Sequence, residues 1–267
     1  MKYAVDHDMH IHSQLSLCSG HPEQTVENIL KYAKETGLKK ICLTDHFWDD
    51  PVEGAIEWYR KQNYAHIAQA LPLPQEEGIT FDFGCETECD RFMTLGIARE
   101  TIDKFAFVIV PTSHLHIKGF VIDEDVTSVA ARAKLYMERN HALMDMDLPF
   151  EKMGLAHFTC ELMGQNSEGE YRDILNAISD ASYAEFFERV AASGMGVELN
   201  LPLRDCSDGD MLRPYRIARS CGCKFYLGSD AHTPGGFAQA RARFEAITEA
   251  LCLTENDKFA LASSESR

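Results

Sequence analysis

The sequence predicts an α/β fold and, within that class, a (β/α) barrel of about seven strands in preference to an open sheet. Short apolar runs alternate with amphipathic helical patterns along the chain, which is the order of parallel βαβ units. The length of 267 residues suits one barrel, and no linker-like stretch or internal repeat divides it. We therefore expect a single domain over residues 1–267, with a polar tail at residues 258–267.

The predicted strands are short apolar runs bounded by turn residues or by polar side chains. An extended run at residues 3–5 opens the chain and leads into a histidine-rich segment. The other expected strands, in order, are residues 40–44, 79–84, 105–111, 153–156, 196–199 and 224–227.

The predicted helices carry apolar residues at helical spacing. In residues 25–36, Val26, Ile29 and Leu30 form one stripe, and Gly37 follows where a C-cap glycine belongs. Another apolar stripe, which begins at Tyr183, predicts a helix ending near Gly194. The remaining expected helices cover residues 53–71, 126–146, 210–221 and 237–251.

The composition narrows the range of partners. With 26 Lys and Arg residues against 42 Asp and Glu, the formal net charge is −16, which disfavours nucleic-acid backbones and anionic membranes. No signal-peptide pattern and no membrane-spanning apolar run is visible in the sequence. The nine cysteines are scattered, as expected for reduced thiols in the cytoplasm and not for a disulfide framework.

Histidines and acidic residues gather where the predicted strands end. His10 and His12 are two apart, so on a strand they point to the same face; alone, such a pair can be two half-exposed polar residues. Barrel enzymes build their active sites at the carboxyl ends of the strands. The other candidates at strand ends are His46, Glu86, His114, His157, Asp230 and His232.

Six motifs in order give the chain a resemblance to the PHP (polymerase and histidinol phosphatase) family. A single His-x-His is weak, but the series spans nearly the whole sequence and closes with Gly-Ser-Asp-Ala-His. The segments that carry the resemblance are Asp8–His12, Thr44–His46, Gly84–Glu86, Thr112–His114, Ala156–His157 and Gly228–His232.

The resemblance implies a distorted (β/α)₇ barrel, TIM-like, with a site for two to three divalent metal ions. It implies that Glu86 bridges two ions, the second of them also held by His114 and His157. His116 competes with His114 for that place, and His114 is favoured; His116 could otherwise meet the substrate. The remaining implied ligands are His10, His12 and Asp230 at the first ion and His21, His46 and His232 at the third.

Imidazole and carboxylate ligands suit zinc, manganese or iron, and a shared carboxylate holds two such ions close together. A water bridging them becomes a hydroxide nucleophile near neutral pH, so hydrolysis of a phosphate ester is the expected reaction, with no side-chain nucleophile. Asp45, Glu198 and Asn200 would orient imidazoles or hold water, with ordinary strand-end capping as the alternative for the last two. The resemblance implies that Arg204 meets the substrate phosphate, with a solvated arginine as the alternative.

We expect a small phosphorylated metabolite as substrate, histidinol phosphate being one candidate. A nucleotide or oligonucleotide phosphoesterase, or a nuclease-type module, is the second hypothesis, which the net charge of −16 opposes for long strands. A non-catalytic metal-binding protein is the third, although every motif is filled. Metal-dependent amide hydrolysis lacks the expected carboxylated-lysine pattern. The sequence leaves the oligomeric state open.

Overall fold

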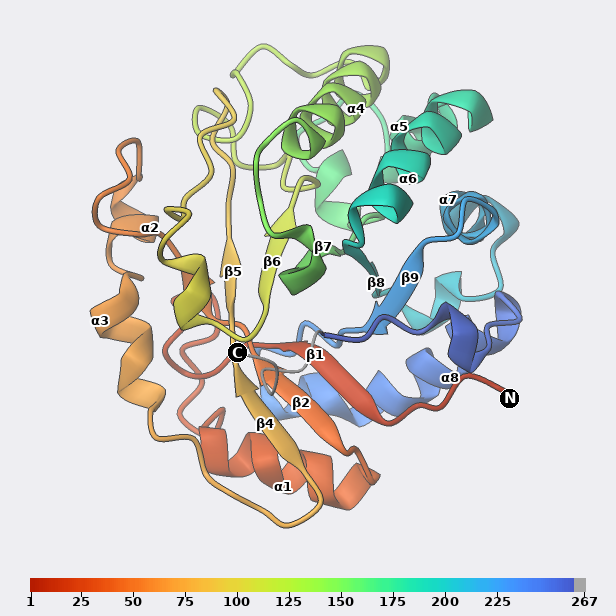
Figure 1. Ribbon diagram of the computed structural model, residues 1–267. Coiled ribbons are helices and arrows are strands. Elements are labelled where there is room, and N and C mark those ends of the chain that lie inside the picture. The colour runs from red at the N-terminus through yellow and green to blue at the C-terminus, as the bar shows by residue number, and fades with distance from the viewer. Residues whose placement is uncertain (262–267) are drawn as a thin grey trace.

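The computed structural model describes residues 1–261 and has the α/β architecture that the sequence predicts. Parallel strands surround a common centre, and helices cover them from outside (Figure 1). A barrel-like arrangement of parallel strands covered by helices is therefore confirmed as the fold class. Among the described residues, no helix is both long enough and apolar enough to cross a membrane.

The strands form two parallel sheets. The smaller sheet has the order β1 (His7–Ile11), β2 (Lys40–Leu43) and β4 (Thr80–Phe83). The larger sheet runs in the order β3 (His46–Phe47), β5 (Cys85–Thr87), β6 (Val108–Pro111), β7 (Met153–Ala156), β8 (Gly196–Leu199) and β9 (Lys224–Leu227).

Two of the seven predicted strands, residues 40–44 and 79–84, are each followed, after a break, by a short strand that pairs in the other sheet. The first break separates β2 from β3, and the second, at Gly84, separates β4 from β5. A Cβ at position 84 would overlap the carbonyl oxygen of Phe107 and lie 2.8 Å from Cys42 Sγ, so only glycine fits this close approach. Each break is followed at once by a candidate ligand, His46 or Glu86.

The two sheets also meet where β1 passes the segment that follows β9. Asp230 N–H donates to the His10 carbonyl at 2.8 Å, and His12 N–H donates to the Ala231 carbonyl at 3.1 Å. An isolated parallel bridge joins Ile11 to Ala231. The first and last motifs of the sequence therefore lie side by side.

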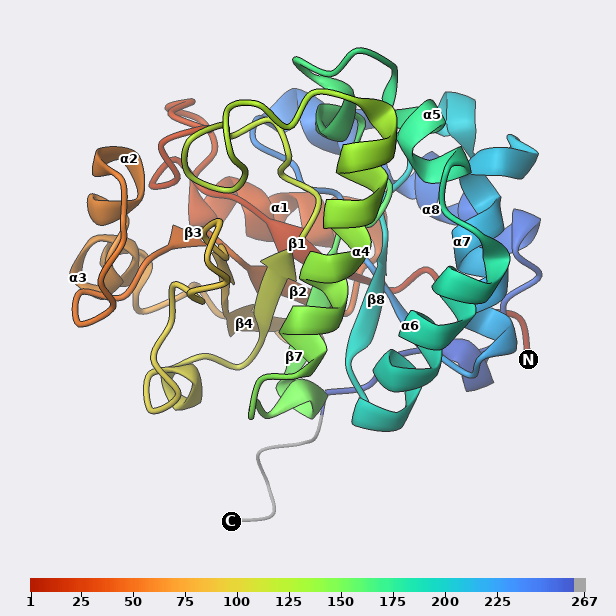
Figure 2. The same cartoon turned by 90° about the horizontal axis from the view of Figure 1, so that it is seen from above.

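Helices with clear capping residues begin and end close to the predicted positions. Helix α1 is capped by Thr25 and by Gly37 at φ 72°, and α6 by Ser179 and by Gly194 at φ 80°. Figure 2 shows α4 and α6 along one side of the barrel. The main helices are α1 (Val26–Thr36), α4 (Val129–Met144), α5 (Tyr171–Asn176), α6 (Asp180–Ser193), α7 (Gly209–Ser220) and α8 (Ala240–Ala250).

Three expectations about single elements were wrong. Residues 53–71 contain only the short helices α2 (Glu57–Arg60) and α3 (Tyr64–Ile67) and a 3₁₀ turn at Ala68–Ala70, because the segment folds over the barrel mouth in pieces. Residues 3–5 precede the strand; β1 itself includes His10, and His12 follows directly after its end.

The third wrong expectation concerns the polar tail at residues 258–267. Phe259 is buried, and its ring lies 5.7 Å from that of Phe107 and 6.1 Å from that of Tyr226, both buried as well. Its N–H donates to the Phe225 carbonyl at 2.8 Å. The start of this segment thus packs in a second apolar core with Met9 and Cys42, and residues 262–267 lie outside the described part of the chain.

Candidate metal centre

His10 and His12 point to one place at the end of β1. The pairing of β1 with β2 is irregular between Asp8 and Ile11, and such a bulge re-aims side chains. Both histidines are fully buried, and their Nε2 atoms lie 3.0 Å apart. Two ring nitrogens at that distance require either a shared proton or a shared cation between them.

Glu86 on β5 lies at the centre of the cluster. Its Oε2 is 3.2 Å from His12 Nε2, 3.5 Å from His10 Nε2 and 3.1 Å from His46 Nδ1. Its other oxygen, Oε1, is 3.1 Å from His157 Nε2. One buried carboxylate therefore contacts imidazoles from β1, β3 and the end of β7, as a carboxylate shared by two ions would.

Asp230 faces the same point from the opposite side of the barrel mouth. Its Oδ1 lies 3.1 Å from His12 Nε2 and 3.3 Å from His10 Nε2. Asp230 has φ 54° and His157 has φ 25°, conformations that cost a non-glycine residue roughly 1–3 kcal/mol each. Unfavourable backbone at two candidate ligands indicates that their placement is imposed by the surrounding fold.

Hydrogen bonds orient the rings of the first motif. Glu198 on β8 is fully buried, and its Oε1 lies 2.7 Å from His10 Nδ1. His12 Nδ1 lies 3.0 Å from Ser16 Oγ, which in turn donates to Asp45 Oδ1 at 2.8 Å. With both Nδ1 atoms as donors in these bonds, each ring in its neutral, metal-binding form would direct an Nε2 lone pair at the cluster.

Gly228 is required for this arrangement. A Cβ at that position would overlap Glu198 Oε1 and lie 2.7 Å from His10 Cβ. The glycine of the last motif thus lets the chain after β9 approach the carboxylate that orients His10.

Of the two competing histidines, the structure brings His114 to the cluster. His114, Glu86 and His157 offer ligand atoms within 4.8 Å of one another. His114 Nδ1 lies 2.7 Å from Glu88 Oε2, and His157 Nδ1 lies 2.9 Å from Ser113 Oγ. His116 is half-buried beside them and borders a cavity, and burial together with His114 and His157 lowers its pKa to about 4.

There are two further groups of possible metal ligands, and both contain His12. His10, His12 and Glu86 form one, within the same 4.8 Å limit. The other contains His12, His46, His232 and Cys18. His21 belongs to none of the three groups: its Nδ1 accepts the N–H of Glu23 at 3.2 Å in the turn before α1, so the structure does not bring it to the third position.

The charges in the cluster favour a bound cation. Burial would lower the pKa of His12, but Asp230 and Glu86 raise it to about 9. Burial likewise opposes charge on Glu86 and Asp230, yet the neighbouring imidazoles hold the pKa of each carboxyl well below its usual range. The ionised carboxylates require positive charge, which protonated imidazoles provide in the metal-free site and which divalent ions with nitrogen and oxygen ligands would provide after displacing those protons. The residues present therefore fit a metal centre.

Two cavities adjoin the cluster and share His157, Leu162 and Asp230. The histidine cavity, of about 330 Å³, contains His46, Glu86, His114 and His232, and its outer wall is apolar. Trp58, Ile56 and Ile117 belong to that wall. The second, of about 510 Å³, we call the arginine cavity; its polar border includes Asn200, Gln239, Arg204 and Arg243.

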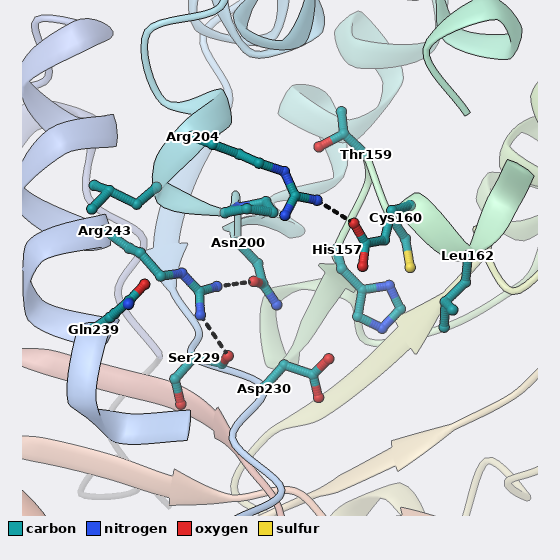
Figure 3. Close-up of a pocket in the computed structure, with 13 residues that line it drawn as sticks. His157, Thr159, Cys160, Leu162, Asn200, Arg204, Ser229, Asp230, Gln239 and Arg243 are labelled. Carbon is teal, nitrogen blue, oxygen red and sulfur yellow. Dashed lines mark hydrogen bonds and ion pairs between the residues drawn. The ribbon is translucent and has the colours of Figure 1, made fainter. Parts of the chain in front are cut away.

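Figure 3 shows how the two arginines of the arginine cavity differ. Arg243 on α8 donates to Asn200 Oδ1, to the Leu201 carbonyl at 3.0 Å and to the Ser229 carbonyl at 3.4 Å. These three acceptors are uncharged, so the cation is held next to Asp230 without being neutralised by them. Arg204 has a 65% exposed side chain and pairs with Glu161 at 2.5 Å.

Sequence reasoning missed Glu88, Cys18, Ser16 and Arg243. The spacing of Glu88 could have indicated it, because on a strand it shares a face with Glu86 two residues earlier. Ser16 and Cys18 lie in a loop where no period applies. Arg243 lies on a helix surface with no motif around it.

Comparison with known proteins places these observations in a family. The sequence pattern of the PHP domain matches residues 8–201, which is well over half of the chain. No curated protein matches.

Among solved structures, the histidinol phosphate phosphatase of Lactococcus lactis, complexed with zinc, L-histidinol and phosphate, superposes with a TM-score of 0.58 at 18% identity. The superposition covers 92% of this chain and 93% of that one. A putative histidinol phosphatase of Listeria monocytogenes gives a TM-score of 0.62 at 11% identity, covering 90% and 100%. At these identities the likeness shows the fold.

Proposed function

The chain belongs to the PHP domain family and is a metal-dependent phosphoesterase, and on that premise we propose that it hydrolyses the phosphomonoester of a small metabolite. We propose two to three divalent ions, zinc, manganese or iron, as its cofactor. The ligands we propose are His10, His12, Glu86, Asp230, His46, His114, His157 and His232.

The observation that carries the proposal is the convergence of buried ring nitrogens on a buried carboxylate. His10 Nδ1 is engaged by Glu198 and His12 Nδ1 by Ser16, so both Nε2 atoms face Glu86 and each other at 3.0 Å. Without a metal ion, this geometry needs a proton between the two nitrogens. It is what a centre that shares one carboxylate between two ions requires.

Divalent ions held there would supply a nucleophile by lowering the pKa of water and would offset charge on the phosphoryl group. The chain's own residues do the positioning. Glu198 and the Ser16–Asp45 pair fix the ring orientations of His10 and His12 through the Nδ1 hydrogen bonds. Glu88 does the same for His114.

We propose that the arginine cavity receives an anionic part of the substrate. Arg243 is held in place by neutral acceptors, so its charge is available to a phosphate or carboxylate oxygen. Arg204 is exposed at the rim and is engaged by Glu161, so it contributes less. Cavities of about 510 and 330 Å³ match the size of small-molecule sites.

The histidine cavity offers an apolar surface against which the leaving group of the substrate could pack. Trp58, Ile56 and Ile117 border the histidine cavity, and an aromatic wall suits an imidazole, as in histidinol phosphate, or a nucleobase. This wall is the reason to keep nucleotides as a second candidate, while the charge of −16 argues against long strands.

A substrate panel tests the function. The metal-loaded chain is assayed with histidinol phosphate, 5′-nucleotides, cyclic phosphodiesters and short oligonucleotides, and phosphate release is measured. We expect the highest kcat/KM for a small phosphomonoester. Preference for diesters or oligonucleotides would overturn the phosphomonoesterase assignment, and no release from any of them would overturn phosphoester hydrolysis as the function.

A further inference from the structure

The loop after the first motif brings a thiol to the metal centre. Accepting the metal centre of the proposed function, we propose that Cys18 is a ligand of its third ion, together with His46 and His232. Cys18 takes the position that the sequence resemblance gave to His21. A thiolate ligand would also make this position chemically distinct from the other two.

The distances place the sulfur among the histidines. Cys18, His12, His46 and His232 each have a ligand atom within 4.8 Å of the others. The rings of His12 and His232 stack with centroids 4.3 Å apart, and those of His12 and His46 lie 4.6 Å apart. Because the Nε2 of His12 is already directed at the first ion, Cys18, His46 and His232 would supply three ligands, the number that catalytic zinc sites take from the protein.

The loop that carries Cys18 is held in this place by hydrogen bonds. Ser19 N–H and Gly20 N–H both donate to the Ser16 carbonyl, at 2.9 and 3.2 Å, so the chain turns around Cys18. Ser19 Oγ donates to the His232 carbonyl at 2.5 Å. The residue after the cysteine is therefore bonded to one of the proposed co-ligands.

A buried histidine nitrogen gives further support for a ligand at this position. His46 is only 6% exposed, and its Nδ1 makes no hydrogen bond with any residue that the structure describes, although Glu86 Oε2 lies 3.1 Å away. His232 Nδ1 donates to the Asp230 carbonyl at 2.8 Å, which leaves its Nε2 lone pair free to coordinate. A buried imidazole nitrogen and a carboxylate oxygen this close, without a hydrogen bond between them, would both be satisfied by a cation.

Ligation would release the thiol proton to solvent as the sulfur–metal bond forms. Thiolate is a soft ligand, so it would favour zinc or iron over manganese at the third position. The other two positions offer nitrogen and oxygen only. The metal positions within one chain would then differ in which metal ion they prefer.

Cobalt titration of the full, metal-stripped chain tests this proposal. Co²⁺ bound to thiolate gives a near-ultraviolet charge-transfer band, whereas Co²⁺ bound to imidazole and carboxylate does not. We expect the band in the unmodified chain, with cobalt per chain counted by elemental analysis. We expect Cys18→Ser to lose the band and one cobalt equivalent while its circular dichroism is unchanged.

Two matched variants separate the alternatives. Cys252→Ser removes the other exposed cysteine, and His21→Ala removes the competing ligand; both should keep the band and the stoichiometry. Loss of one cobalt in His21→Ala, with the full count retained in Cys18→Ser, would overturn the proposal. Two or more bound cobalts without the band would overturn it alone, whereas a chain that binds no cobalt would overturn the proposed metal centre too.

Discussion

The histidine cavity and the arginine cavity are adjacent, but their polar side chains are held in place in different ways. In the histidine cavity, buried groups orient the rings: Glu88 bonds His114, and Ser113 bonds His157. In the arginine cavity, Arg243 is anchored by neutral groups, while Arg204 extends to solvent. If the proposed function is right, the chemical step would use the preorganised histidine cavity, whereas substrate recognition would depend on the few polar side chains of the arginine cavity.

The largest effect should come from replacing Glu86, the carboxylate that we propose two ions share. Glu86→Gln keeps the shape but loses the bridging carboxylate, so kcat should fall by about 10³-fold or more, given that metal-held charge is worth several kcal/mol and 1.36 kcal/mol is tenfold. The measurement is phosphate release by the reconstituted variant. Glu245→Gln on the exposed face of α8 is the matched control, and a Glu86 variant within about tenfold of the unmodified chain would contradict the account.

Acid should weaken metal binding strongly. In the metal-free protein the pKa of His12 is about 9, so below that pH an ion must displace its proton. For one such proton the apparent affinity should rise about tenfold per pH unit from pH 7 to 9 and level off above. Calorimetry in buffers of different ionisation enthalpy would count the protons released. An affinity that does not change over this range would contradict the protonation of the empty site.

Weakening the hydrogen bond that orients one imidazole ring should reduce activity less than removing a metal ligand. Glu198→Gln weakens the partner of His10 Nδ1, and losses of about 10–100-fold in metal affinity are typical of such partners. The variant should regain turnover at high metal concentration, which a purely structural defect would not permit. Glu185→Gln on the surface of α6 is the control. Unchanged metal affinity would mean that Glu198 does not position the ring.

The smallest effects should lie in the arginine cavity, and they should be unequal. Arg243→Ala should raise KM for a phosphomonoester about tenfold or more, as expected for charged hydrogen bonds of about 1.5–3 kcal/mol. Arg204→Ala should change it less than about fivefold, because an exposed ion pair is worth about 0–1 kcal/mol. Arg241→Ala, on the same helix as Arg243 but bonded to Glu245 and the Thr36 carbonyl, is the control. The reverse order of effects would transfer the anion-binding role to Arg204.

The sequence predicted the local features of the fold better than the features that depend on tertiary contacts. Strand ends could be predicted from short apolar runs that stop just before His157, before Asn200 and before Gly228, because period and composition are local properties. The breaks after β2 and at Gly84 could not, since they depend on which neighbouring strand each half pairs with. Residues 53–71 have helical composition, but only four-residue helices α2 and α3 form where the segment crosses the barrel mouth.

The side chains of the site show the same limit. His10, His12 and Glu86 belong to motifs, so their meeting could be predicted. Arg243 and Cys18 reach the site through a helix and a loop whose positions are set by tertiary contacts, such as the bond between Ser19 and the His232 carbonyl. No spacing in the sequence encodes such contacts.

The central claim is that the buried histidines and carboxylates hold catalytic metal ions. The most direct measurement is elemental analysis of the chain purified without chelators, together with activity before and after stripping. We expect two to three equivalents of zinc, manganese or iron per chain, with phosphatase activity lost on stripping and restored on reloading. A folded chain that contains no metal and retains full activity would contradict the account.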